Sequence, residues 1–182
     1  DYHCNIGKIR NSLCNSRKNV IRYITKFDKE PLIFGCNIKD ELKEEVIGLK
    51  EQGILPCLAV IQVGNDPASS VYVNNKKKAC AYIGIESLSY ELDENISQEA
   101  LLELISELNE NEKVNGILVQ LPLPKHIDEN SVIEAITPSK DVDGFHPETV
   151  GNMCIGTRGF LPCTPAGVIQ LLKRSNIEIE GK

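Results

Sequence analysis

The chain has 182 residues, the size of one domain or slightly more, and 41% of them are hydrophobic, as in ordinary globular proteins. The net charge of −6 argues against a general binder of nucleic acids or anionic membranes, because phosphate recognition needs clustered positive charge. No stretch approaches the run of about 20 apolar residues that a membrane span needs. We therefore expect a globular domain that binds neither nucleic acid nor membrane.

Residues 1–36 differ in composition from the rest of the chain. Residues 1–30 hold seven basic and three acidic residues, whereas the remainder holds 13 basic and 23 acidic ones. This basic, serine-containing composition weakly resembles an organelle transit peptide, and a fragment or a mis-assigned start explains it equally well. We therefore expect residues 1–36 to be a separate segment, either disordered or mis-assigned.

The seven cysteines suit a reducing compartment. Their number is odd, and none of them has the Cys-x-x-Cys spacing of a zinc site. Cys57 and Cys80 lie within apolar runs, where a thiol behaves as a small hydrophobic group. We expect reduced thiols, no metal and a cytoplasmic protein, with an organelle as the alternative if residues 1–30 are the remnant of a transit peptide.

The first half of the regular region alternates helices and strands. Ile38 begins a helical apolar pattern that predicts a helix over residues 38–49, and the apolar run 57–63 predicts a buried strand. Asp66 suits the N-cap and Pro67 the first position of a helix that reaches Tyr82, with Gly84 ending it. Residues 87–92 predict a second strand.

The second half continues the same alternation. Ser97 suits the N-cap of a helix that has four apolar residues on one face: Leu101, Leu104, Ile105 and Leu108. A third strand is predicted over residues 114–121, where Pro122 ends it, and a short helix over residues 131–136. The last predicted helix runs from Thr164 to about Lys173.

Alternating strands and helices predict an α/β fold with a parallel sheet, because parallel strands need crossover connections. Ligands of such sheets bind at the carboxyl ends of the strands. Two segments, Gly64–Ser70 and Gln120–Pro124, are therefore expected at the mouth of one crevice.

Tyr72 and Lys76 are the first candidates for chemistry. They are four residues apart on a predicted helix, so they share a face. The phenol ring could stack on a planar substrate, and the amine could move a proton if its surroundings lower its pKa. A solvated basic face is the ordinary alternative, since Lys77 and Lys78 follow directly.

Two further segments carry polar groups at strand ends. Gln120 closes an apolar strand and could hold an amine or a substrate carbonyl, although a bond to the backbone would also satisfy it. Asp141 and Asp143 precede Gly144, and a carboxylate there could ligate a metal or pair with adjacent N–H groups of a heterocycle. An acidic turn is the alternative for this pair, and His146 is expected to be a polar loop residue rather than a base.

Several common templates are missing from the sequence. The chain contains no Gly-x-x-x-x-Gly-Lys-Ser/Thr phosphate loop and no Gly-x-Ser-x-Gly nucleophile turn. No Gly-x-Gly-x-x-Gly follows a predicted strand. The residues alone therefore indicate an α/β domain with a cleft and a possible lysine base.

Four segments in register read VGNDPASSVYVNNKKKAC, NGILVQLPLP, KDVDGFHPETVG and PCTPAGV. Together, over about residues 38–182, they make the chain resemble the bifunctional methylenetetrahydrofolate dehydrogenase/cyclohydrolase family. The resemblance implies a three-layer α/β domain with a mainly parallel sheet, of the amino-acid-dehydrogenase-like N-terminal type, with residues 37–182 as the tetrahydrofolate-binding catalytic domain. A Rossmann-like NADP domain is expected next in the family, beyond Lys182.

The function implied by this resemblance belongs to one-carbon metabolism, which serves purine and amino-acid biosynthesis. Members oxidise 5,10-methylenetetrahydrofolate with NADP, or with NAD in some cases, and hydrolyse the methenyl product to 10-formyltetrahydrofolate. They bind folate between two α/β domains, use no metal and are typically homodimers. With its cofactor residues expected beyond Lys182, this chain alone is expected to lack the dehydrogenase step.

The resemblance also assigns roles to residues of this chain. Lys76 would be the general acid and base, Gln120 would hydrogen-bond it, Tyr72 would pack on the substrate ring, and Asp143 would bind the pterin edge. The implied substrate-binding residues are Tyr72, Val73, Asn74, Asn75, Lys76, Val119, Gln120, Leu121 and Asp143.

Two other interpretations stay open at this point. Residues 1–36 do not match the family's usual start, and the family's C-terminal segment that returns to the folate domain is not matched either. The chain could therefore be a truncated, non-catalytic remnant that binds folate or only dimerises. Without the resemblance, it could be a small α/β domain for another planar anion.

Overall fold

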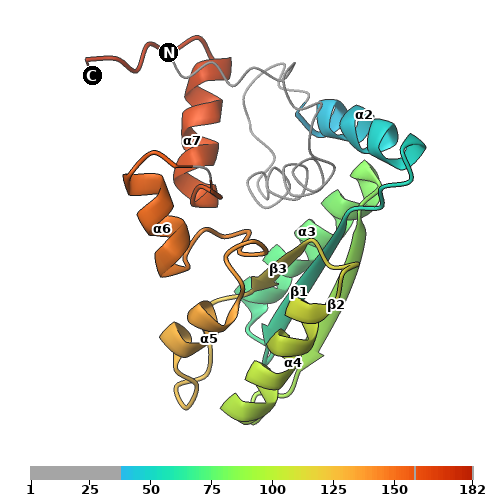
Figure 1. Cartoon of the computed structure of the whole chain (residues 1–182), viewed down its shortest axis with the longest axis vertical. Helices are drawn as coiled ribbons and strands as arrows, with labels where there is room; N and C mark the ends of the chain where they lie inside the picture. The colour runs from blue at the N-terminus through green and yellow to red at the C-terminus, as the bar shows by residue number, and fades with distance from the viewer. Residues whose placement is uncertain (1–37, 158, 182) are drawn as a thin grey trace.

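The computed structural model describes residues 38–157 and 159–181, so the predicted segment 1–36 lies outside the described residues (Figure 1). Three parallel strands form a sheet in the order β2-β1-β3. The central strand β1 spans Cys57–Val63, and its neighbours are β2 (Glu86–Leu92) and β3 (Gly116–Val119). The predicted parallel sheet is thereby confirmed.

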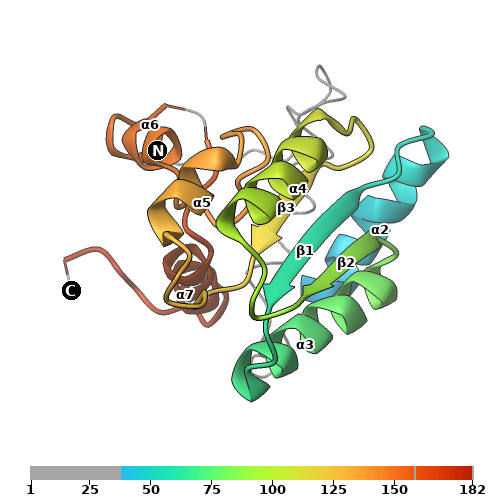
Figure 2. The ribbon, with the colours of Figure 1, turned by 90° about the horizontal axis from the view of Figure 1, so that it is seen from below.

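Helices cover both faces of the sheet. Figure 2 shows α2 and α3 together on one face and α4 on the other, with α5 beside α4. The helices are α2 (Ile38–Glu51), α3 (Pro67–Ile83), α4 (Gln98–Glu110), α5 (Glu129–Ala135), α6 (Pro147–Cys154) and α7 (Cys163–Arg174). The arrangement is the three-layer α/β fold that the family resemblance implies.

Strand β1 is buried on both faces, and its side chains alternate between two hydrophobic cores. Leu58 and Val60 pack with residues of α2 and α3, whereas Ala59 and Ile61 pack with residues of α4 and α5. Successive side chains of a strand point to opposite faces, which explains the division. An uninterrupted apolar run is therefore the expected sequence of this central strand.

Helix α3 begins and ends where its cap residues predict. The side chain of Asp66 accepts a hydrogen bond from the backbone N–H of Ser69 at 2.7 Å, and Pro67 occupies the first position. This hydrogen bond holds the pKa of the Asp66 carboxyl below its ordinary value. Gly84 adopts the left-handed conformation at the other end and donates its N–H to the carbonyl of Cys80 at 2.8 Å.

Two elements differ from the sequence expectation. Strand β3 covers only residues 116–119 of the predicted 114–121. At its start, the side-chain oxygen of Asn115 accepts from the N–H of Cys57 at 2.9 Å, where a ladder would use a backbone carbonyl. Helix α6 is not among the predicted elements, because its apolar residues Val150 and Met153 are exposed and form no buried stripe.

Helix α7 is attached to α2 by an ion pair. The guanidinium of Arg174 donates to both carboxylate oxygens of Glu41, at 2.8 and 2.7 Å. The hydrogen bond from Arg174 holds the pKa of Glu41 below its ordinary value. Any stabilisation from this pair is therefore present at neutral pH and lost as the pH falls through that lowered pKa. Because both side chains are partly exposed, this ion pair contributes little to the stability of the fold.

The two cysteines that lie within predicted apolar runs are buried. Cys57 and Cys80 lie inside the domain, and Cys57 and Cys154 carry free thiols. Burial, with a smaller effect from the carboxylate of Glu86, raises the pKa of the Cys57 thiol to about 11, so this thiol stays protonated at neutral pH. None of the helices in the described part of the chain combines the length and hydrophobicity that a membrane span requires.

Candidate functional site

A buried lysine and an amide meet at the carboxyl end of the sheet. Lys76 lies on the inner face of α3, and only 9% of it is exposed. Its Nζ donates a hydrogen bond to the Oε1 of Gln120 at 3.2 Å. The amide is fixed in turn, because its Nε2 donates to the carbonyl of Leu121 at 2.8 Å and the backbone N–H of Gln120 donates to the carbonyl of Ile61 at 2.8 Å.

The sheet register explains why these two side chains meet. Val119 pairs with Ile61, so Gln120 follows the last paired position of β3. Leu118 belongs to the core on the α3 side, and Gln120, two residues later, shares that side. The contact between Lys76 and Gln120 therefore depends on the neighbouring positions of β1 and β3, which the local sequence alone does not specify.

The other predicted residues of α3 have different surroundings. Tyr72 lies one helical turn before Lys76 and is 37% exposed. Val73 packs in the core, whereas Asn74 and Asn75 are exposed. The structure thus leaves the phenol accessible beside the buried amine and directs the two asparagines to the surface.

Sequence reasoning missed Gln62, which connects the end of β1 to the first turn of α3. Its Nε2 donates to the hydroxyl of Ser70 at 2.9 Å and to the carbonyl of Gly64 at 3.2 Å. Gln62 is buried, although it stands in a strand that is otherwise apolar. An amide in such a strand is the signal that could have found it, because buried polar groups need partners.

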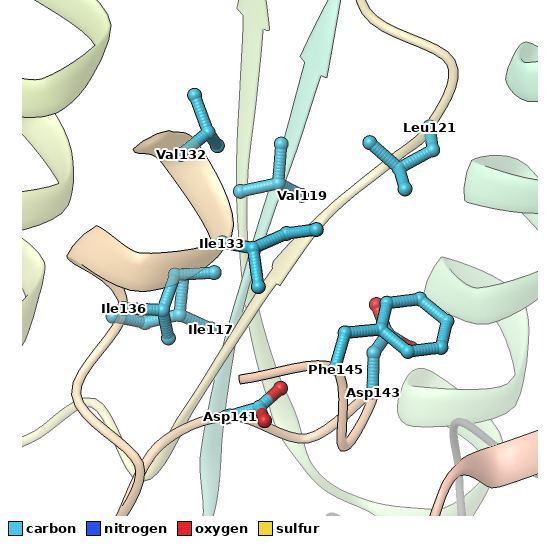
Figure 3. Close-up of a pocket in the computed structure, with 9 residues that line it drawn as sticks. All are labelled: Ile117, Val119, Leu121, Val132, Ile133, Ile136, Asp141, Asp143 and Phe145. Atoms are coloured by element: carbon cyan, nitrogen blue, oxygen red, sulfur yellow. The ribbon is translucent and has the colours of Figure 1, made fainter. Parts of the chain in front are cut away.

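A small pocket lies on the opposite side of β3 from Lys76, between β3, α5 and the segment that follows residue 140. Figure 3 shows side chains of α5 reaching toward those of β3. The lining residues are Ile117, Val119, Leu121, Val132, Ile133, Ile136, Asp141, Asp143 and Phe145. Of the predicted site residues, the pocket holds Val119, Leu121 and Asp143.

The two acids of the Asp-Val-Asp-Gly sequence have different tasks. Asp141 is only 4% exposed, and its carboxylate accepts hydrogen bonds from the backbone N–H groups of Gly144 and His146, both at 2.9 Å. Asp143 is half-buried and lies beside Phe145 in the pocket lining (Figure 3). Asp141 thus shapes the turn, and Asp143 follows it in the pocket lining.

His146 has a structural task at the start of α6. Its Nδ1 accepts a hydrogen bond from the backbone N–H of Glu148 at 3.1 Å, as an N-cap side chain does. Within residues 38–157 and 159–181, no three His, Cys, Asp or Glu side chains gather as metal ligands would. The candidate polar groups of the site are the amine of Lys76, the amide of Gln120 and the carboxylate of Asp143.

These groups can move a proton and recognise a planar ligand. An amine can donate or accept a proton, and the neutral amide of Gln120 can hold it in place without competing for that proton. A carboxylate at an apolar pocket can accept two adjacent N–H groups. Since the pair and the pocket lie on opposite sides of β3, a ligand that uses both must pass around the carboxyl end of this strand.

Comparisons with known proteins find close relatives. The model for the tetrahydrofolate dehydrogenase/cyclohydrolase catalytic domain matches residues 34–143. The bifunctional protein FolD of Agathobacter rectalis is 69% identical over 150 residues, which cover 82% of this chain and 54% of that protein. This chain spans about half the length of the curated relatives it matches.

Solved structures agree with these sequence matches. The bifunctional enzyme FolD of Campylobacter jejuni, a methylenetetrahydrofolate dehydrogenase/cyclohydrolase, has a TM-score of 0.77 at 57% identity, over 80% of this chain and 52% of that chain. The Trypanosoma brucei methylenetetrahydrofolate dehydrogenase-cyclohydrolase, solved with NADP cofactor and an inhibitor, has a TM-score of 0.76 at 42% identity, over 80% and 50% of the two chains.

Proposed function

Because the chain belongs to the tetrahydrofolate dehydrogenase/cyclohydrolase family, we propose that residues 37–182 form the folate-binding catalytic half of a bifunctional enzyme of one-carbon metabolism. The full enzyme would oxidise 5,10-methylenetetrahydrofolate to the methenyl form and hydrolyse that product to 10-formyltetrahydrofolate. The proposal rests on one observation above all, the hydrogen bond between the buried amine of Lys76 and the amide of Gln120.

We assign the proton chemistry of the hydrolysis to Lys76. Methenyltetrahydrofolate is a cationic amidinium, so an attacking water must lose a proton and a ring nitrogen must later gain one. One amine can perform both transfers in turn, if it is held near the reacting carbon. Gln120 supports this role because it fixes the direction of the Lys76 side chain without taking the proton.

We assign recognition of the substrate to the pocket and to the exposed part of α3. The pterin carries adjacent N–H groups, which the carboxylate of Asp143 could accept in a bidentate pair. Val119 and Leu121 offer apolar contact at the same pocket. Tyr72 is exposed enough to stack on the ring that follows the pterin.

The dehydrogenase step would use NADP, as the Trypanosoma brucei enzyme was solved with NADP, or NAD as the alternative. The described residues do not fit a dinucleotide. The turn after β1 begins Gly64-Asn65-Asp66, and the one after β3 begins Gln120-Leu121-Pro122, so neither offers the glycine-rich turn that admits a pyrophosphate. Hydride transfer is therefore assigned to no residue of this chain.

We also propose that the chain acts as a homodimer in the cytoplasm. Strand β2 is an edge strand of the described sheet and could extend it across a two-fold axis. The free thiols of Cys57 and Cys154 support a reducing compartment. Sedimentation equilibrium is expected to give twice the mass of one chain, and a single-chain mass at every concentration would contradict the dimer.

The function is tested by supplying 5,10-methenyltetrahydrofolate to the purified chain and by titrating it with 5-formyltetrahydrofolate, a stable folate. We expect saturable binding and hydrolysis faster than the spontaneous rate in the same buffer. Binding without hydrolysis would favour the non-catalytic remnant. Neither binding nor hydrolysis by a folded sample would overturn the folate function for this chain.

A further inference from the structure

We infer that Lys140 is a positioning residue for Asp143, and that it acts by fixing the segment before Asp143 to the C-terminal end of α4. The inference rests on the proposed folate function. It concerns the half of the site that recognises the ligand rather than the half that moves the proton.

The amine of Lys140 is held at the end of α4. Its Nζ donates to the backbone carbonyls of Leu108, Asn109 and Asn111, at 2.9, 2.6 and 2.8 Å. The last carbonyls of a helix have no partner within the helix and carry partial negative charge. Since α4 has no basic residue in its own last turn, Lys140 supplies the cation that this helix end lacks.

A second contact strengthens the attachment. The side chain of Asn109 donates to the carbonyl of Ala135 at 2.7 Å and accepts from the N–H of Thr137 at 3.0 Å. The last turn of α4 thus holds the chain at residues 135, 137 and 140. These contacts fix the path of the backbone from the end of α5 to the acidic turn.

The contacts of Lys140 fix the position of Asp143 because few residues separate the two. The carbonyl of Lys140 accepts from the N–H of Ile117 at 2.9 Å, and Asp141 forms a bridge with the same residue of β3. Asp141 then orders the turn through Gly144 and His146. Asp143 lies inside that turn, so its place in the pocket lining follows from the position of Lys140.

The test removes the amine and measures ligand binding by the full chain. Lys140→Gln is expected to weaken binding of 5-formyltetrahydrofolate about tenfold, because a carboxylate misplaced by a fraction of an ångström loses its paired hydrogen bonds. For hydrolysis, KM is expected to rise in proportion while kcat changes less than about threefold. Lys140→Arg, which keeps a positive charge at the end of α4, is expected to bind within about threefold of the unaltered chain.

A double variant separates positioning from simple stabilisation. If Lys140 acts through Asp143, then Lys140→Gln combined with Asp143→Asn binds no more weakly than the weaker single variant. Effects that multiply, or unchanged binding in Lys140→Gln, would overturn the inference and leave the folate function standing. An unaltered chain that binds no folate would overturn the function first, and this role of Lys140 with it.

Two other variants complete the experiment. Lys113→Gln removes the same charge from an exposed residue near the end of α4 and is expected to leave binding unchanged within about twofold. Asn109→Ala cuts the second attachment and is expected to weaken binding in the same direction as Lys140→Gln. It tests the same attachment if Lys140→Gln does not fold, and unchanged binding in Asn109→Ala would then overturn the inference.

Discussion

Lys76→Met is expected to lower kcat for the hydrolysis of 5,10-methenyltetrahydrofolate by at least about a hundredfold, the usual contribution of a positioned acid or base. The substitution removes the only atom of this side chain that can carry a proton. Methionine has nearly the same length and fits the buried face of α3, so the loss should come from the chemistry and not from unfolding. Binding of 5-formyltetrahydrofolate is expected to change far less than kcat.

Two comparisons make this result specific. Lys78→Met removes a charge from an exposed position of the same helix and should leave kcat unchanged. Lys76→Arg keeps a cation near Gln120, but a guanidinium does not release its proton in a protein, so this variant should also be inactive. Full activity in Lys76→Arg would mean that the site needs only positive charge, and full activity in Lys76→Met would remove Lys76 from the mechanism.

Gly144→Ala is expected to lower the free energy of unfolding by about 3 kcal/mol, the sum of left-handed strain and overpacking. Gly144 has a φ of +73°, and a Cβ built on it would lie 2.8 Å from the backbone N of Pro162 and 2.9 Å from the backbone C of Leu161. These atoms belong to the main chain just before α7 and cannot turn aside as a side chain can. Urea unfolding followed by circular dichroism measures the change.

Gly151 provides the matched control. It lies within α6, and a Cβ there would meet no atom within 4 Å. Gly151→Ala should therefore change the free energy of unfolding by no more than about 1 kcal/mol, in the stabilising direction, since alanine favours helices over glycine. Equal effects of the two substitutions would show that the close approach of the backbone at Gly144 does not exclude a side chain there.

The sequence predicts the helices with clear end signals almost to the residue. Asp66, Pro67 and Gly84 define α3 because each provides a distinct backbone property at a helix end. Helix α6 was missed because His146 is not a usual N-cap residue and because the exposed apolar side chains of this helix give no buried stripe. Strand β3 was predicted too long because the apolar pattern continues beyond the paired residues.

The site could be predicted only in part, because its residues meet through the topology. Helical spacing relates Tyr72 to Lys76, and the strand pattern places Gln120 at a strand end, but their meeting requires β3 to lie beside β1. The residues of the acidic turn alone left both acids open as ligand-binding groups, and the choice of Asp143 came from the family resemblance. The backbone hydrogen bonds to Asp141 distinguish it from Asp143, and such bonds leave no mark in the composition of a turn.

The inner face of α3 has a further consequence, for the history of the chain. Lys76 occupies a position whose neighbours on that face, Val73 and Cys80, are buried core residues. An apolar residue at position 76 would avoid the cost of desolvating an amine. A lineage released from selection for chemistry would therefore be expected to replace this lysine early, since the fold gains from burying an apolar side chain at this position. A folate-binding descendant that had lost its activity would be recognised by an aliphatic residue there, well before its sheet or its caps had changed.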